Sequence, residues 1–200
     1  MDMPKIVDPT EKKTHIAKAT WRVILEQGVK GATVRNIAKE AGLSLGALRH
    51  YFSTQDELLA YAMNLVKDRA TARIEKIGIS DLPPKEKVIR ILLELVPVDD
   101  IKMAEMEVWF AFTFHRKYAE EQLDTQHEGF FSEMGSLIEF LDQHQLLRKD
   151  LDKEMTSEHL YALVDGLALH ALLEPERLDR KRVADVLTHH INSICRIEKE

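Results

Sequence analysis

The most constraining feature of this sequence is where its prolines stand. The six prolines occupy positions 4, 9, 83, 84, 97 and 175, which leaves two proline-free stretches, 10–82 and 98–174. Proline interrupts helices because it lacks an N–H group and its ring clashes with the preceding turn. Both stretches are rich in Ala, Leu, Glu, Lys and Met, and their apolar residues recur at spacings of three and four. The pattern predicts an all-α protein.

The helix boundaries follow from the residues between the apolar stripes. Gly28 and Gly31 bracket the first loop, and Gly78 is placed to cap the C-terminus of the fourth helix. Residues 80–84 are expected to end that helix, and their prolines to begin the next one. Asp165-Gly166 is the only dipeptide that suggests a hairpin, but its apolar flanks favour a helix. We expect about nine helices, at 10–27, 34–41, 45–52, 55–77, 84–96, 101–116, 118–145, 154–173 and 180–197.

Composition excludes several classes of protein. The chain is 44% hydrophobic and 31% charged, so it can form a core. Its apolar runs reach about five residues, far below the ~20 that cross a bilayer, and charge throughout the first thirty residues leaves no signal-peptide core. We therefore expect a cytoplasmic protein with no membrane partner. The single cysteine, Cys195, predicts neither an internal disulfide nor a zinc site, and we expect no metal and no cofactor.

Charge is distributed unevenly along the chain. The net charge is −6, yet residues 1–60 hold nine Lys and Arg against seven Asp and Glu, so the remaining residues carry −8. A polyanion such as nucleic acid is attracted to basic surface. The N-terminal end is therefore the only plausible surface for such a partner.

Residues 33–52 have the pattern of a helix, a tight turn and a second helix. Thr33 can cap the first helix, whose inward stripe is Val34, Ile37, Ala38 and Ala41. Gly42 can adopt the left-handed conformation that ends this helix, Leu43 plugs the turn, and Ser44 can cap the second helix. Leu48 and Phe52 point inward at a spacing of four, and the residues left outside are Leu45, Gly46, Ala47, Arg49, His50 and Tyr51.

This outward face suits close approach to a DNA major groove, which admits an α-helix. Arg49 can bind a guanine through its two-pronged guanidinium. His50, Tyr51, Thr33 and Arg35 can hold phosphates. A solvated helix with a stray arginine is the alternative interpretation of so short a segment.

The residues from Gly31 to Leu48, followed by His50-Tyr51-Phe52 and Asp56-Glu57-Leu58-Leu59, closely resemble the TetR family of bacterial transcriptional regulators. The resemblance runs over about residues 10–68. It implies a helix-turn-helix DNA-binding domain at 8–68, with the motif at about 31–52, and a helical ligand-binding and dimerisation domain at 69–200. The family commonly has a lysine where this chain has Gln55, and a polar or basic residue at the position of Leu45. The expected DNA-binding residues are Thr33, Arg35, Ser44, Leu45, Gly46, Ala47, Arg49, His50, Tyr51 and Gln55.

Aromatic residues and methionines concentrate between Met103 and His115. Such side chains offer adaptable apolar contact, so the cluster predicts one wall of an effector pocket, and ordinary core is the alternative. Thr54-Gln55-Asp56-Glu57 fits a capping box at the start of a long helix that can act as a lever between this body and the DNA-binding module. The candidate pocket residues are Glu105, Glu107, Trp109, Phe110, Phe114, Phe130 and Met134.

The region 84–195 is similar to the C-terminal domain of BetI-type members of the family, most clearly at 164–172. This similarity leaves a quaternary ammonium such as choline, a hydrophobic compound and a polyamine open as effectors. It also implies that the last two helices pair with their copies in a homodimer, with a monomer that buries them internally as the alternative. The expected interface residues are Leu163, Gly166, Leu167, His170, Val186, His190 and Ile194.

Together with these residues, the resemblance implies a repressor that binds double-stranded operator DNA with palindromic symmetry and is released by a small-molecule effector of unknown identity. The competing hypothesis is a helical enzyme with an incidental N-terminal module. It lacks support, because no pair of histidines has metal-binding helical spacing, no Gly-x-Gly occurs, and no catalytic residues can be nominated. A nucleoid protein without a ligand would need a broad basic surface, which this chain lacks.

Overall fold

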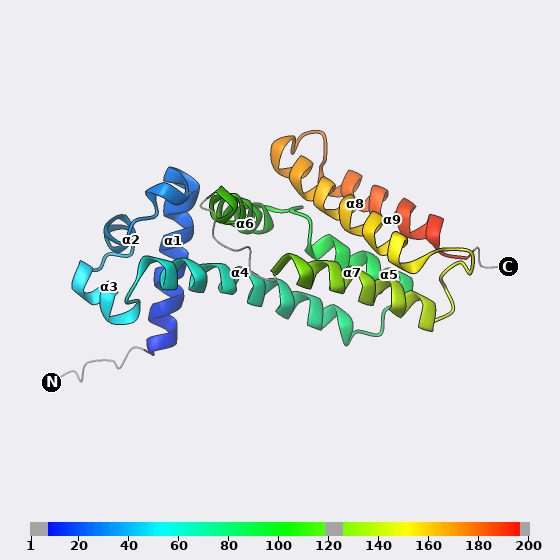
Figure 1. Ribbon diagram of the computed structural model, residues 1–200, viewed down its shortest axis with the longest axis horizontal. Helices are drawn as coiled ribbons and strands as arrows, with labels where there is room; N and C mark the ends of the chain where they lie inside the picture. The colour runs from blue at the N-terminus through cyan, green and yellow to red at the C-terminus, as the bar shows by residue number, and fades with distance from the viewer. Residues whose placement is uncertain (1–7, 119–125, 197–200) are drawn as a thin grey trace. The chain divides into compact units, whose positions relative to one another are not determined.

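The computed structural model describes residues 8–118 and 126–196, and this part of the chain is helical without a strand (Figure 1). The prediction of an all-α protein is confirmed. The described helices are α1 Pro9–Gly31, α2 Val34–Glu40, α3 Leu45–Tyr51, α4 Gln55–Gly78, α5 Pro84–Glu94, α6 Asp100–Tyr118, α7 Gln126–Gln143, α8 Lys153–Leu173 and α9 Arg180–Ile194. None of them is both long enough and apolar enough to cross a membrane.

The chain divides into two compact units. Of the described residues, the first unit comprises 8–69 and 107–118, and the second comprises 70–106 and 126–196. α4 and α6 therefore each supply residues to both units. The second half of α6, which we expected to belong to the ligand-binding body alone, contributes Val108 and Phe112 to the core of the first unit.

In the first unit, α1 packs against α2 and α3, and the start of α4 completes the core. The indole N–H of Trp21 donates to the carbonyl of Ala62 over 2.9 Å, which ties α1 to α4. α1 begins after Asp8, whose side chain accepts from the backbone of Thr10, and has Pro9 in its first turn. Gly28 has φ 70° and ψ 173°, which are not helical values, so α1 is interrupted by a kink there before its last residues end at Gly31. The predicted loop between these glycines is thus a kink.

In the second unit, α7 packs against α8 and α5, and α5 packs against α9. A shared apolar core includes Leu92, Ile138, Leu160 and Leu187, each almost fully buried. After α7 the chain pairs with the residues that follow α9. Arg196 N–H donates to Leu146 O over 2.8 Å, and Arg148 N–H donates to Ile194 O over 3.0 Å.

Gly78 differs from its predicted role. It is the last residue of α4, and it is not one of the two glycines with positive φ in the described ranges. The ammonium of Lys87 donates to its carbonyl over 2.7 Å, and the hydroxyl of Ser80 donates to the carbonyl of Ile77 over 2.6 Å. Because side chains satisfy these free carbonyls, the helix end needs no left-handed residue.

Candidate nucleic-acid interface and effector site

The helix-turn-helix is stabilised by short local hydrogen bonds. The Thr33 side chain accepts from the backbone N–H of Asn36 over 3.3 Å, and the Ser44 side chain accepts from that of Ala47 over 3.1 Å. Gly42 has φ 65°, which lets the N–H of Leu43 donate to the carbonyl of Ala38 over 2.9 Å. The predicted caps of α2 and α3 and the predicted glycine turn are confirmed.

The orientation of α3 follows from its two inward anchors. Leu48 is fully buried and Phe52 is 1% exposed, as the spacing of four predicted. Leu45, Gly46, Arg49 and His50 are exposed, and Ala47 is half-buried. Tyr51 does not lie fully outside, because its ring packs on the core and against the edge of His50, with ring centroids 5.4 Å apart.

The chain segment that contains α3 carries no negative charge. Residues 41–55 contain no Asp or Glu. The nearest preceding acid, Glu40, forms an ion pair with Arg22. In residues 8–118 and 126–196, no carboxylate pairs with Arg35 or Arg49, both of which are exposed. These guanidinium groups are therefore available to a polyanion.

α4 begins with the predicted capping residues. The Thr54 side chain accepts from the N–H of Glu57 over 3.1 Å, and the Glu57 carboxylate in turn accepts from the N–H of Ser53 over 2.8 Å. The carboxylate of Glu57 thus binds the N–H of Ser53, one residue before the capping residue Thr54. Gln55 is half-buried at the first position of α4, and its role in DNA binding stays a prediction.

Sequence reasoning missed His15, whose ring nitrogen lies 3.1 Å from the carbonyl of Ala41. This contact joins α1 to the end of α2, beside the turn. No local pattern identifies such a contact, because the two residues are 26 positions apart. His15 belongs to the support of the motif rather than to its outward face.

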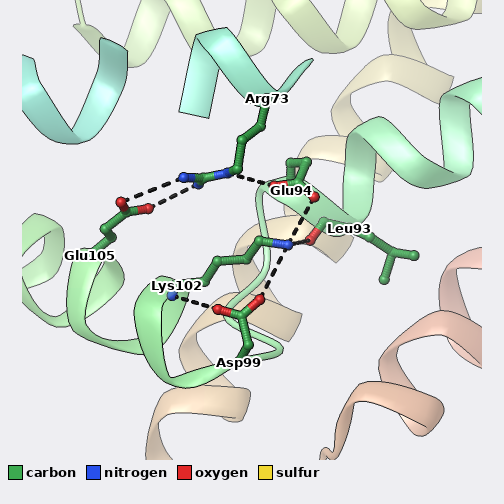
Figure 2. Close-up of polar contacts among 6 residues, drawn as sticks. All are labelled: Arg73, Leu93, Glu94, Asp99, Lys102 and Glu105. Carbon is green, nitrogen blue, oxygen red and sulfur yellow. Dashed lines mark hydrogen bonds and ion pairs between the residues drawn. The ribbon is translucent and has the colours of Figure 1, made fainter. Parts of the chain in front are cut away.

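An ion-pair network in the second unit was also missed (Figure 2). Arg73 of α4 binds both oxygens of Glu105 on α6, with its Nη2 2.9 Å from Oε2, and its Nε lies 2.7 Å from Glu94 on α5. Lys102 extends the network to Glu94 over 2.9 Å and to Asp99 over 3.6 Å. The network joins three helices and balances its buried charges.

Glu105 is only 5% exposed, and it neutralises Arg73 instead of standing open to a ligand. Burial by itself lowers the pKa of Arg73, but the hydrogen bonds and charges of Glu105 and Glu94 outweigh it and hold that pKa above its ordinary value. A signal for this network exists in the sequence. Arg73 continues the apolar stripe of Ala62 and Val66 on α4, and a charge on a buried stripe requires a partner.

The other candidate pocket residues lie in different surroundings. Trp109 packs against the core of the first unit, with the ammonium of Lys67 5.9 Å from its ring centroid. Phe110 and Phe114 stack with centroids 5.9 Å apart, and both Phe114 and Glu107 are exposed. Met134 is 1% exposed in the core of the second unit, and the side chain of Phe130 lies outside the described residues. The pocket stays a prediction.

The residues expected at a dimer interface show graded exposure. Leu167 and Ile194 are buried in the core of their own unit. Leu163, Gly166, Val186 and His190 are half-buried, and His170 is exposed beside Glu174. In the described part of the chain, His190 Nε2 is the one buried side-chain polar atom without a hydrogen-bond partner.

The surroundings of His190 lower the pKa of its ring. Its pKa lies below its ordinary value because burial disfavours the charged ring and because His159 and His189 lie nearby. The interface itself stays a prediction.

Comparison with protein families decides what this arrangement is. Residues 16–62 match the family described as "Bacterial regulatory proteins, tetR family". Residues 84–196, more than half of the chain, match "BetI-type transcriptional repressor, C-terminal". The chain belongs to the TetR family. It is therefore a transcriptional regulator with a helix-turn-helix and a ligand-binding C-terminal domain, and the competing enzyme hypothesis is set aside.

Individual TetR-family proteins resemble the chain over nearly its whole length. The "HTH-type transcriptional regulator PksA" of Bacillus subtilis (strain 168) is 56% identical over 193 residues, which cover 96% of this chain and 94% of that protein. The "HTH-type transcriptional regulator BetI" of Escherichia coli (strain K12) is 28% identical over 198 residues, covering 94% and 95%.

Solved structures share the TetR fold. A transcriptional regulator from Rhodococcus sp. Rha1 has a TM-score of 0.79 and 27% identity, and the match covers 96% of this chain and all of that one. A regulator from Saccharomonospora viridis, solved in complex with choline, has a TM-score of 0.73 and 20% identity, covering 94% of this chain and all of that one. The second likeness shows the fold alone.

Proposed function

We propose that this TetR-family regulator is a homodimeric repressor that binds a palindromic operator through two copies of α3 and leaves it when a small-molecule effector binds. The acid-free outward face of α3 carries the proposal, because it combines exposed Arg49 with the small residues Gly46 and Ala47. In a two-fold dimer, two such helices meet successive major grooves when they are about 34–36 Å apart. Because its target is chromosomal DNA, we place the protein in the cytoplasm.

The half-buried apolar residues of α8 and α9 support an isologous dimer. Leu163 and Val186 pack only partly on their own core, and a side chain at Gly166 would meet no atom within 4 Å. An exposed helix face with a small residue permits close approach of a second helix. The BetI-type match over residues 84–196 includes both helices.

The effector proposal rests on the two helices that belong to both units. An effector that prefers one arrangement of α6 shifts the population toward it, with leverage set by its differential affinity, typically ~1–3 kcal/mol. The ammonium of Lys67 lies 5.9 Å from the ring centroid of Trp109, so a quaternary ammonium at that face of the ring would compete with it. This geometry favours an uncharged apolar effector at that ring, although choline is bound to the Saccharomonospora viridis protein.

The DNA-binding proposal is tested by selecting bound fragments from the host's own genomic DNA and measuring affinity for the selected operator and for random duplex. Arg49→Ala should lose the preference for the operator by about 1–3 kcal/mol, since a bidentate contact to guanine discriminates between bases. Arg35→Ala should weaken binding to both duplexes alike, because a phosphate contact carries no sequence information.

Arg90 provides the matched control for these arginine variants. It is an exposed arginine on α5 that pairs with Glu86, so Arg90→Ala should change neither affinity. An unaltered operator preference in Arg49→Ala would contradict the assignment of α3 as the reading helix.

The effector proposal is tested by release from that operator. Choline and a series of apolar metabolites are titrated against the bound complex, with fluorescence anisotropy of labelled DNA as the readout. Trp109→Ala should abolish release by the active compound while DNA affinity is retained, and Met155→Ala, which removes an exposed apolar side chain of α8, should behave as wild type. An equal response of the Trp109 variant would assign that ring to packing alone.

A further inference from the structure

Leu45 is an exposed leucine on the face of α3 that carries Arg49. It is 37% exposed. Leu45 is the first residue of α3, and Arg49 follows it at a spacing of four, so the two side chains are neighbours on the helix surface. An exposed leucine is common by itself, but this one stands in the acid-free segment 41–55, on the helix proposed to enter the DNA groove.

The neighbour of Leu45 indicates that space is needed outside the protein. A Cβ at Gly46 would meet no atom within 4 Å, so internal packing does not require glycine there. Glycine within a helix costs about 1 kcal/mol relative to alanine. The small residue leaves room for a partner to come close to the backbone beside Leu45.

The chemistry of the major groove offers a match for an apolar side chain. Among the base pairs, only those with thymine present an apolar group there, the C5-methyl. Arg49 lies four residues after Leu45, about one turn or roughly 6 Å along the helix. Base pairs rise about 3.4 Å each, so the two side chains meet positions one or two base pairs apart.

We propose that Leu45 is a specificity-determining residue that reads the C5-methyl group of a thymine one or two base pairs from the guanine bound by Arg49. The inference rests on the proposed role of α3 and adds to it the class of base recognised. Each half-site of a palindromic operator then contains this thymine once. Leu45 stands where the resemblance implies a polar or basic residue. This chain would therefore recognise the base by apolar contact at that position instead of by a hydrogen bond.

The test replaces thymine by uracil, which removes the methyl group and leaves every hydrogen-bonding atom of the base in place. Each thymine of the selected operator is replaced in turn, symmetrically in both half-sites, and the affinity of the full-length protein is measured. One replacement should weaken wild-type binding by about fourfold for each methyl lost, or about fifteenfold for the symmetric pair. The same replacement should leave the affinity of Leu45→Ala unchanged.

Leu25 provides a matched control. It is a leucine of α1 with 39% exposure, in the same unit as Leu45, so Leu25→Ala should show the full uracil effect. Leu45→Met, which restores an apolar side chain of similar length, should recover a methyl dependence. Thermal unfolding of each variant confirms that the first unit is folded.

The outcomes separate this inference from the proposed function. If no genomic fragment is preferred over random duplex, the proposed function fails, and this inference fails with it. If an operator is found but no thymine shows a methyl effect with wild type, only the role of Leu45 is overturned. A methyl effect of equal size in Leu45→Ala overturns it too, because the methyl would then be read by another residue or through DNA stiffness.

Discussion

The recognition segment of the first unit and the ion-pair network of the second differ in the sequence distance that their contacts cross. The caps of α2 and α3 join residues three apart, Thr33 to Asn36 and Ser44 to Ala47. Arg73 instead reaches Glu94 over 21 positions and Glu105 over 32. A local contact is set by the backbone of one turn, whereas a distant contact exists only after several helices have packed.

This difference explains which parts of the site were predictable. Thr33, Gly42 and Ser44 each act through the backbone of their own turn, so residue type and spacing sufficed to predict them. The sequence also placed Leu48 inward through its spacing to Phe52. It did not assign Glu105 its partner, and the residue was interpreted as a polar group of the pocket. The partners of a carboxylate on α6 are decided by which helices lie beside it.

The core of the recognition segment provides the largest expected effect. Leu48→Ala removes a fully buried side chain and should lower the free energy of unfolding by about 3 kcal/mol, measured by urea denaturation. Leu45→Ala on the same helix removes an exposed side chain and should change it by less than about 0.5 kcal/mol. Similar losses in the two variants would contradict the orientation of α3.

Disrupting the ion-pair network should have an intermediate effect on stability. This prediction compares a long-range ion pair with a local one. Glu105→Gln leaves Arg73 without one buried carboxylate and should cost about 2 kcal/mol of unfolding free energy. Glu86 is the matched control, because its pair with Arg90 is exposed and lies within one turn of α5. Glu86→Gln should cost less than about 0.5 kcal/mol. An equally small cost in both variants would show that the network adds little to stability.

The smallest effects concern two nearby glycines, Gly42 in the turn and Gly46 in α3. Their replacement by alanine should change the stability of the protein in opposite directions. Gly42→Ala forces a Cβ into a left-handed conformation and should destabilise the protein by about 1 kcal/mol. Gly46→Ala removes a helical glycine and should stabilise by up to about 1 kcal/mol, yet it should weaken operator binding because α3 approaches the groove less closely. Thermal unfolding and anisotropy on the same two proteins measure both quantities. A gain in both stability and affinity for Gly46→Ala would contradict close approach at that residue.

The sequence by itself determined the helical class, the two caps, the glycine turn and the inward residues of α3, because each depends on interactions within one or two turns of the chain. Only the tertiary structure decided that the second half of α6 completes the core of the first unit, that Glu105 binds Arg73, and that Lys67 covers Trp109. These contacts join residues far apart in the chain, and their formation depends on how whole helices pack. Periodicity shows which face of a helix is buried, but not against what.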